Sequence, residues 1–372
     1  MAGAPKYIAS AVVFREARLE DFEGISAVQS RNGLVAKPLE EWNHLWRGNP
    51  TFQRLAQWHI GWIAENQDGK IVGYAGHVPL SYDFRGRQVI AACAHGLVID
   101  PLYRGYGVHL LKRHLGDNLT DMVLTTTANF NSGRLCDALC SRVPTGNWGE
   151  SSFWITERRG FAASTVKSKR WPKWLSLPAS AALSLRARVS KSHAFNAAEA
   201  NGELKVRTGF DDDFDTFWGA LKRRYPERLL ATRSRELLQW HFKYALERGK
   251  VWIVTTGDAH ITAYAILCRD DNPTIGLKRI RLTDYQALNE DTEPLTRMLT
   301  WAFHRCQEQG IHVLEAFGFR PDKQQMVDSL KPYRRRLPFW QYFYRTRHKD
   351  LRQQLHDPAV WDPSHFDADA TL

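Results

Sequence analysis

Leu97-Val98-Ile99-Asp100-Pro101-Leu102-Tyr103-Arg104-Gly105-Tyr106-Gly107-Val108 joins an apolar strand to a glycine-rich turn through a proline corner. Val108, Leu111 and Leu115 follow at helical spacing, so the expected order is strand, loop and helix. The first N–H groups of a helix have no intrahelical partner and lie at the positive end of its dipole. The two glycines let a ligand approach the backbone, and Arg104 adds a cation. The segment therefore predicts a phosphate-binding site.

Other phosphate-binding loops fit this stretch less well. The chain has no GxxxxGKS or GxxxxGKT sequence, and a dinucleotide fingerprint would need a third glycine and an acidic residue after the next strand. A plain structural turn is the remaining alternative. The combination of strand, corner and helix favours a binding loop over that turn.

The segment resembles motif A of the GNAT acetyltransferase superfamily, in which an Arg or Gln, two residues, a Gly, one residue and a Gly or Ala wrap the pyrophosphate of acetyl-CoA. The corresponding run here is Arg104-Gly105-Tyr106-Gly107-Val108-His109, in which His109 takes the place of the last small residue and could itself donate to a phosphate. The resemblance implies acetyl-CoA as the cosubstrate and no metal. The residues that it implies at the cofactor are Leu97, Val98, Ile99, Arg104, Gly105, Tyr106, Gly107, Val108, His109, Asn129 and Asn131.

An internal repeat is the second clue, because residues 61–78 align without gaps on residues 251–268. Both copies have the pattern of a β-hairpin. The same offset aligns the acidic stretch 291–297 with the phosphate loop, so the second copy should not bind a pyrophosphate. The sequence thus predicts an α/β (α+β) fold of two tandem GNAT-like domains, each a mixed, mostly antiparallel sheet flanked by helices.

The expected division of the chain is a GNAT-like acyl-CoA-binding domain at 1–160, a basic linker at 161–203, a degenerate GNAT-like domain at 204–345 and a C-terminal tail at 346–372. Residues 276–282 and 361–364 are also similar to tandem GNAT proteins found with bacterial exopolysaccharide genes. That narrower resemblance implies a sugar or a sugar precursor as the acceptor.

Acyl transfer needs a base for the acceptor, a donor to the thioester carbonyl and an acid for the departing thiolate. His95 is the first candidate base, with a buried structural histidine as an equal alternative. Glu150 is the second, although a loop charge is its more common role. The resemblance implies that backbone N–H groups near Leu97–Ile99 bind the carbonyl. The tyrosine acid that it also implies is missing, so Cys136, Cys140 or a water would act instead, with a core position as the commoner role of such cysteines.

Composition and cysteine usage fit an enzyme with two cores. The chain has 372 residues, of which 43% are hydrophobic and 12% aromatic. Its five cysteines include no CxxC pair, so neither a disulfide framework nor a zinc site is expected. Nothing approaches a membrane span or a cleavable signal peptide, and a cytoplasmic location is therefore predicted.

The net charge of +11 is concentrated between residues 158 and 191, which contain nine Lys or Arg and no Asp or Glu. Tryptophans and an apolar run lie within this basic stretch, as in segments that bind anionic membranes. A solvated linker with a short helix docked on one domain is the favoured alternative, and peripheral contact with the inner face of the membrane is the less favoured one. No specific nucleic-acid partner is expected, because no stacking-aromatic or zinc-finger pattern accompanies the basic run 334–336.

These features together predict an acetyl-CoA-dependent acyltransferase that acts on an amine or hydroxyl of a small-molecule or saccharide acceptor. Two hypotheses from other classes stay open. The basic linker favours a tandem GNAT-like aminoacyltransferase that takes its acyl group from charged tRNA. The missing tyrosine and His109 favour a non-catalytic CoA-binding scaffold.

Overall fold

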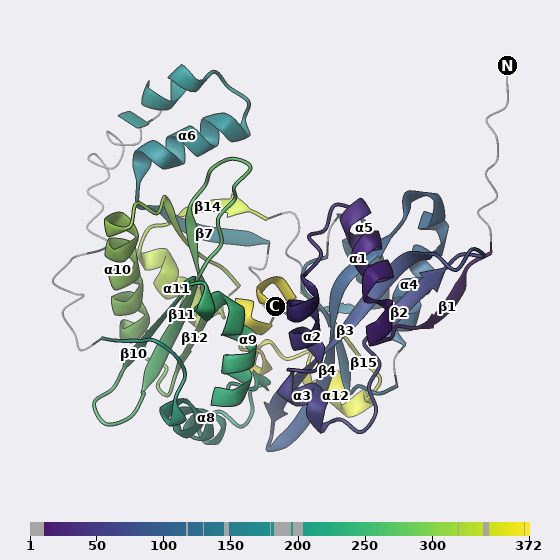
Figure 1. The fold of residues 1–372 in the computed structure, drawn as a ribbon. Coiled ribbons are helices and arrows are strands. Elements are labelled where there is room, and N and C mark those ends of the chain that lie inside the picture. The colour runs from purple at the N-terminus through teal and green to yellow at the C-terminus, as the bar shows by residue number, and fades with distance from the viewer. Residues whose placement is uncertain are drawn as a thin grey trace.

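The computed structural model describes residues 11–116, 118–128, 130–144, 149–178, 180–181, 195, 204–318, 320–337, 342–367 and 369–372. Two lobes, each built on one mixed sheet, lie side by side, and the C-terminal end of the chain lies between them (Figure 1). Helix α9 (Arg235–Glu247) lies on the side of the second sheet that faces the first lobe, and α10 (Glu293–Glu308) covers the opposite side (Figure 1).

The first sheet has eight strands, and all its pairs are antiparallel except β4 with β5. Its strand order is β1 (Val13–Glu16), β2 (Gly61–Glu65), β3 (Ile71–Phe84), β4 (Arg87–Ile99), β5 (Met122–Thr125), β15 (Phe343–Thr346) and β6 (Ser141–Arg142), with β9 (Leu230–Ala231) paired to β3. The helices of this lobe are α1 (Phe22–Arg31), α2 (Leu39–Trp46), α3 (Pro50–Arg54), α4 (Gly107–Leu115), α5 (Phe130–Leu139) and the 3₁₀ helices η1 (Leu19–Asp21) and η2 (Pro101–Tyr106).

The second sheet has seven strands, and only β12 and β13 run parallel. Its order is β14 (Tyr333–Arg336), β7 (Glu150–Ile155), β13 (Val313–Ala316), β12 (Arg279–Ala287), β11 (Ala263–Arg269), β10 (Val251–Thr256) and β8 (Lys205–Arg207). The remaining helices are α6 (Arg158–Ser168), η3 (Lys173–Leu175), α8 (Asp212–Arg224), α11 (Pro321–Ser329), α12 (Lys349–Gln354), η5 (Pro358–Val360), η6 (His365–Asp367) and η7 (Asp369–Thr371).

The two halves exchange a strand, which the sequence analysis did not foresee. Strand β7 comes from the first half of the chain and lies between β13 and β14 of the second sheet. Strand β15 comes from the second half and lies between β5 and β6 of the first sheet. The division at residues 160, 204 and 345 stays a prediction, and the exchange shows that each sheet contains residues from both sides of it.

The repeated hairpins form where the sequence repeat predicts them, but their registers differ. Trp62 pairs with Ala75 across β2 and β3, whereas Trp252 pairs with Leu267 across β10 and β11. The first hairpin has a β-bulge next to its turn and the second does not. A gapless alignment of sequence therefore locates the two hairpins but does not give their cross-strand partners.

One apolar cluster spans the boundary between the lobes. Trp42 and Trp46 of α2 are almost fully buried and belong to the same cluster as Leu238 and Phe242 of α9. Reciprocal hydrogen bonds fix this contact, because Trp240 Nε1 donates to the His44 carbonyl oxygen (2.9 Å) and His44 Nε2 lies 2.9 Å from the Trp240 carbonyl oxygen. The lobes thus share a core.

Within the described ranges no helix is long and apolar enough to cross a membrane. The same residues contain no group of three or more His, Cys, Asp or Glu side chains arranged to bind a metal.

Candidate functional site

Strands β4 and β5 diverge and leave a gap, and a cavity lies beside the end of β4. They pair only over Ala91–Cys93, opposite Met122–Leu124. Beyond Cys93, this edge of β4 has no partner strand among the described residues. A cavity of about 420 Å³ lies beside this end of β4, lined by Asn32, Leu97, Val98, Ile99, Arg104, Gly107, Val108, Leu110, Leu111, Ser132 and Leu135. It therefore brings together the end of β4, the start of α4 and one face of α5.

A β-bulge turns the end of β4 toward this gap. Tyr74 pairs with Val98 and Gly76 with His95, so Ala75 lies opposite two residues of β4. One of these two is Gly96, whose φ of +65° suits glycine. A Cβ at Gly96 would also come within 2.4 Å of the Gln29 amide nitrogen. Bulges bend a strand and leave backbone groups unpaired, which supports the predicted N–H donors near Leu97–Ile99.

The corner that follows β4 is tied to α1. The Asp100 carboxylate accepts hydrogen bonds from Arg31 Nε (2.9 Å) and Asn32 Nδ2 (2.8 Å), and its carbonyl accepts from the Tyr103 N–H (2.9 Å). The chain then passes through η2 into α4, which begins at Gly107. The predicted strand, corner and helix are therefore present, and the N-terminal end of α4 lies at the cavity.

No contact or backbone angle in the described part of the chain requires glycine at positions 105 and 107. A Cβ at Gly105 would meet no atom within 4 Å, and one at Gly107 would meet only Ile99 Cγ2, at an ordinary 3.6 Å. The φ of Gly107 is −58°, a helical value, and Gly105 is not among the glycines with positive φ. The two glycines thus leave this part of the backbone open to close approach of a ligand.

The turn separates Arg104 from two aromatic side chains, Tyr106 and His109, which lie on its other side. Arg104 is exposed, lines the cavity and has no hydrogen-bond or ion-pair partner in the described part of the chain. The rings of Tyr106 and His109 each lie 6.3 Å from the ring of Phe14 and do not line the cavity. Helical geometry explains the separation, since His109 is offset by about 200° from Gly107 around α4. The predicted phosphate contact of His109 therefore has no support from this geometry.

His95 lines a second cavity of about 330 Å³, which shares Leu97 and Ser132 with the first. Burial, with the nearby charge of Lys37, lowers the pKa of His95 to about 3. Its buried Nδ1 has no hydrogen-bond partner among the described residues. The ring is thus neutral at physiological pH and lies at the cleft, but its low pKa makes it a weak base.

Asp369, which sequence reasoning missed, lines the same cavity as His95. It belongs to η7, and its carboxylate accepts hydrogen bonds from Thr126 Oγ1 (2.7 Å) and Thr127 Oγ1 (2.9 Å), just beyond β5. Burial raises the pKa of Asp369 above its ordinary value, although the two hydroxyls oppose the shift. A raised pKa brings a carboxylate closer to the range of an effective base. Thr126 and Asp369 are 243 residues apart, so no local pattern could have joined them.

The other predicted catalytic residues lie away from these two cavities. Cys136 is buried with Leu111 and Phe343, and a hydrogen bond to Cys140, together with burial, raises the pKa of the Cys136 thiol. Neither cysteine lines either cavity.

Glu150 begins β7 of the second sheet, is exposed and forms an ion pair with Arg334 (3.9 Å). The strand exchange therefore separates Glu150 from His95. Asn129 lies outside the described residues, and of Asn131 only the backbone, in α5, is described.

Among the described residues, the corresponding place in the second half has a much smaller pocket. In its parallel pair, β12 with β13, the first strand β12 is followed by α10 as β4 is followed by α4. The pocket near the start of α10 has a volume of only about 20 Å³, and Glu290, Asp291, Asp322 and Asp362 are among the residues that line it. A phosphate there would face carboxylates, which supports the predicted restriction of pyrophosphate binding to the first half.

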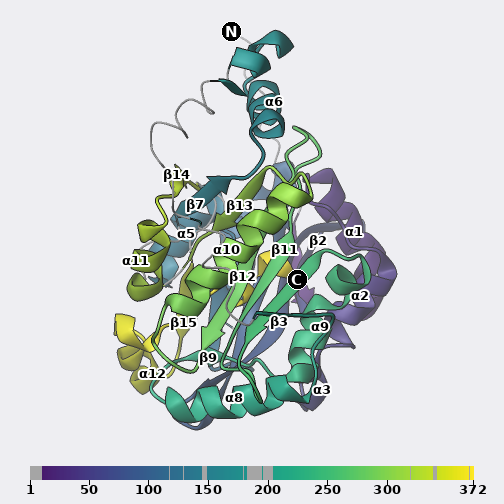
Figure 2. The same cartoon turned by 90° about the vertical axis from the view of Figure 1, so that its left-hand side faces the viewer.

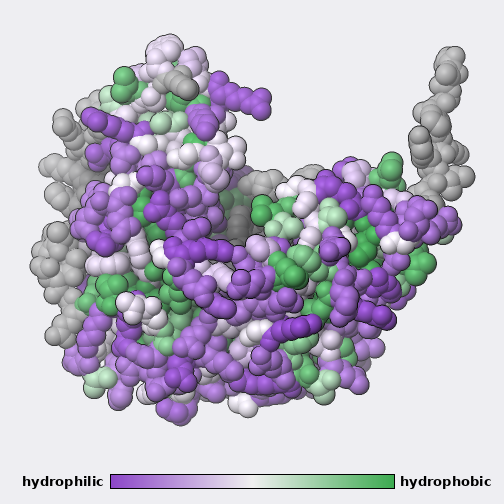
Figure 3. Space-filling model, viewed as in Figure 1, coloured by the Kyte–Doolittle hydropathy of each residue, from purple (hydrophilic) through white to green (hydrophobic). Residues whose placement is uncertain are grey.

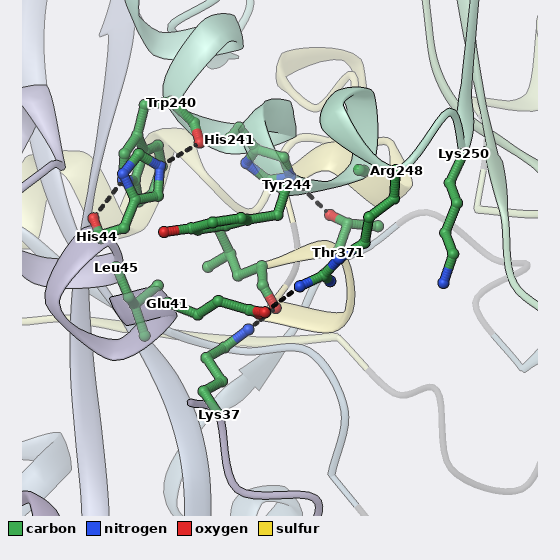
Figure 4. Close-up of a pocket in the computed structure, with 12 residues that line it drawn as sticks. Lys37, Glu41, His44, Leu45, Trp240, His241, Tyr244, Arg248, Lys250 and Thr371 are labelled. Atoms are coloured by element: carbon green, nitrogen blue, oxygen red, sulfur yellow. Dashed lines mark hydrogen bonds and ion pairs between the residues drawn. The ribbon is translucent and has the colours of Figure 1, made fainter. Parts of the chain in front are cut away.

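Two further cavities continue toward the contact between the lobes. One of about 380 Å³ lies between His95 and Arg248, and the other, of about 170 Å³, is shown in Figure 4. In that close-up Lys37, Glu41 and Arg248 point toward one another; Arg248 pairs with Glu41, and Lys37 Nζ donates to the Leu372 carbonyl oxygen (2.8 Å). The visible face of the molecule is hollowed between the lobes (Figure 3). These cavities thus form a second approach to His95, separate from the phosphate loop.

The fold is similar to those of solved acyltransferase structures. N-myristoyltransferase of Saccharomyces cerevisiae with bound myristoyl-CoA aligns with a TM-score of 0.55 and 12% identity, over 93% of this chain and 81% of that one. A GCN5-related N-acetyltransferase from Kribbella flavida aligns with a TM-score of 0.52 and 11% identity, over 92% and 72%. A probable N-acyltransferase from Enterococcus faecalis aligns with a TM-score of 0.54 and 10% identity, over 91% and 73%.

No family model matches the chain, and no curated protein matches it in sequence. The structural similarity extends over nearly the whole chain, and the predicted fold class is confirmed: the protein has a tandem GNAT-like fold, as in N-myristoyltransferase. None of the three proteins is described as exopolysaccharide-associated, so that narrower resemblance stays a prediction.

Proposed function

We propose that the protein is an acyl-CoA-dependent acyltransferase whose single cofactor site lies in the first lobe. The observation that best supports this proposal is the pair of glycines at the start of α4. No contact or backbone angle in the described part of the chain requires glycine at these two positions. They leave the backbone of this turn accessible beside Arg104, which has no partner among the described residues, at the mouth of the cavity that the end of β4, α4 and α5 line. This arrangement suits a pyrophosphate at the loop and a pantetheine arm along the exposed edge of β4.

In the proposed reaction the acceptor amine or hydroxyl attacks the thioester carbonyl. The N–H groups near Leu97–Ile99 that face away from β3 stabilise the oxyanion that forms, because β5 leaves that edge of β4 unpaired. A base removes the acceptor proton, the carbon–sulfur bond breaks, and the CoA thiolate takes up a proton. Since neither Cys136 nor Cys140 lines the cavity, solvent is the proposed source of that proton.

His95 and Asp369 are the two candidate bases, and the directions of their pKa shifts favour Asp369. Both line the same cavity, but burial moves their pKa values in opposite directions, down for His95 and up for Asp369. Loss of the base should lower kcat without weakening acyl-CoA binding. The variants Asp369→Asn and His95→Gln, compared for both quantities, distinguish the two assignments.

The acceptor is proposed to be a small molecule or a saccharide that enters through the cavities between the lobes. Acetyl-CoA is the proposed donor, and the similarity to an N-myristoyltransferase makes longer acyl chains the necessary comparison. Release of the CoA thiol, measured with acetyl-, octanoyl- and myristoyl-CoA against amino sugars, amino acids and polyamines, tests both choices. Acceptor-dependent release that Gly107→Glu abolishes supports the proposal. Release that Gly107→Glu leaves unchanged contradicts it.

A further inference from the structure

The turn after α6 exposes large apolar side chains outside the proposed catalytic cleft. Trp171 is 55% exposed, Trp174 70% and Leu177 73%. By contrast, Trp42 and Trp46 are at most 2% exposed, as expected for a side chain that gains so much from burial. Figures 1 and 2 show that α6 stands away from the body of the second lobe. These side chains therefore form a projecting apolar tip.

The backbone of this tip is ordered by its own hydrogen bonds. Arg170 ends α6 in the left-handed region (φ 55°), and the Trp171 N–H donates to the Val166 carbonyl oxygen (3.0 Å). The Leu175 N–H donates to the Pro172 carbonyl oxygen (3.1 Å), which forms η3. At its other end α6 packs on the second sheet, where the rings of Phe161 and Phe153 are 6.0 Å apart. The exposed tryptophans are thus held on an anchored helix and turn.

Positive charge surrounds the tip. Lys167, Lys169 and Arg170 are exposed immediately before Trp171, and no Asp or Glu occurs between residues 158 and 191. The chain contains 40 Asp and Glu. If they were distributed at random, a stretch of this length would be expected to include several of them. Indole rings beside lysines and arginines are the combination that binds the interface of an anionic bilayer.

We propose that this tip, defined by Lys167, Lys169, Arg170, Trp171, Trp174 and Leu177, docks the protein on an anionic lipid surface. The tryptophans and Leu177 insert at the level of the lipid headgroups, and the three cations bind the anionic headgroups. These side chains belong to the basic linker that the sequence analysis expected to be solvated, with a short helix docked on one domain. The proposal does not depend on the acyltransferase activity.

Co-sedimentation with vesicles tests the proposal. The parent protein should bind vesicles of equal parts phosphatidylcholine and phosphatidylglycerol, and bind vesicles of phosphatidylcholine alone at least tenfold more weakly. The variant Lys167→Gln/Lys169→Gln should partition into the anionic vesicles roughly 25-fold more weakly, at about fivefold per charge. Trp171→Ser/Trp174→Ser should also lose binding. Added salt should weaken the binding of the parent.

Matched controls come from other exposed positions. Val206→Ser removes an apolar side chain that is 56% exposed on β8, and Arg223→Gln/Arg224→Gln removes two exposed cations of α8. Both controls, and Gly107→Glu, should bind vesicles like the parent, so failure of the cofactor site and failure of the docking surface are distinguishable. Equal binding by parent and tip variants would overturn the proposal, as would no binding to either vesicle. Self-association that the tryptophan variant abolishes, without vesicle binding, would overturn it in favour of a protein partner.

Discussion

Removal of Arg233 should strongly destabilise the protein, because this side chain holds the C-terminal tail to the second lobe. Its guanidinium is fully buried and donates to the equally buried Asp284 carboxylate through Nε (2.9 Å) and Nη2 (3.0 Å). Nη2 also contacts Ser364 Oγ (3.3 Å) and Asp367 Oδ1 (3.4 Å) of the tail. Tyr264 Oη donates to Asp284 as well (2.7 Å). The Arg233 cation is thus the main group that offsets the cost of burying the Asp284 and Asp367 carboxylates.

The expected loss in the free energy of unfolding depends on the buried carboxylate charge that the removal of Arg233 leaves unpaired. Breaking a buried ion pair by removing one partner typically costs 3–5 kcal/mol, because the remaining charge stays desolvated. Arg233→Met fills a similar volume and should therefore lower the free energy of unfolding by about 3–5 kcal/mol. The double variant Arg233→Met/Asp284→Asn removes the stranded charge and should recover part of that loss.

Urea unfolding followed by tryptophan fluorescence and circular dichroism measures both variants, with coincidence of the two signals as the test of a single transition. A loss below about 1 kcal/mol for Arg233→Met would refute the reasoning. So would a double variant whose loss equals the sum of the two single losses, since residues in one network should be coupled.

The remaining predictions concern the cleft and pH. Arg104→Ala should weaken acyl-CoA binding roughly tenfold to a hundredfold, the equivalent of a charge-assisted hydrogen bond worth about 1.5–3 kcal/mol, and unchanged affinity in a binding titration would remove Arg104 from the site. Asp369→Asn should lower kcat while leaving acyl-CoA affinity unchanged, whereas a loss of affinity alone would point to a role in binding. Burial lowers the pKa values of His95 and His241 to about 3. Between about pH 6.5 and pH 3, these two histidines therefore bind protons in the unfolded chain but stay neutral in the folded protein. Each histidine should therefore lower stability by up to about 1.4 kcal/mol per pH unit in this window, whereas Asp367, whose pKa burial raises to about 7, opposes the fall. The loss of stability between pH 7 and pH 5 should accordingly be smaller for His95→Gln than for the parent, an equal change in both being the contrary result.

Local sequence patterns were sufficient to predict the phosphate loop. Strand, corner and helix are adjacent in the chain between Leu97 and Leu115, so spacing alone predicts them, and the hairpin repeat predicts the tandem fold in the same way. The exchange of β7 and β15 was beyond this reasoning, because a short strand does not specify which sheet it joins.

The candidate base also shows that local patterns do not predict contacts between distant segments. His95 was found because it precedes the loop, whereas Asp369 reaches the cleft only when the tail folds back against Thr126 and Thr127. His109 was assigned to the phosphate from its place in the motif, but its ring packs near Phe14 on the side of α4 away from the cavity. Motif position gives the neighbourhood of a side chain, and helical phase decides the direction in which it points.

The central claim is a single acyl-CoA site at the start of α4, and calorimetric titration with acetyl-CoA tests it most directly. Gly107→Glu should fold normally, because the backbone angle is helical and a Cβ there meets only Ile99 at 3.6 Å, yet it puts a carboxylate where the pyrophosphate would lie. Gly209→Glu, at a glycine with no atom within 4 Å of its added Cβ, is the matched control. The account predicts saturable one-to-one binding in the parent and in the control and none in Gly107→Glu. Equal binding by all three would contradict the placement of the site, and no binding by the parent would favour the tRNA-dependent alternative.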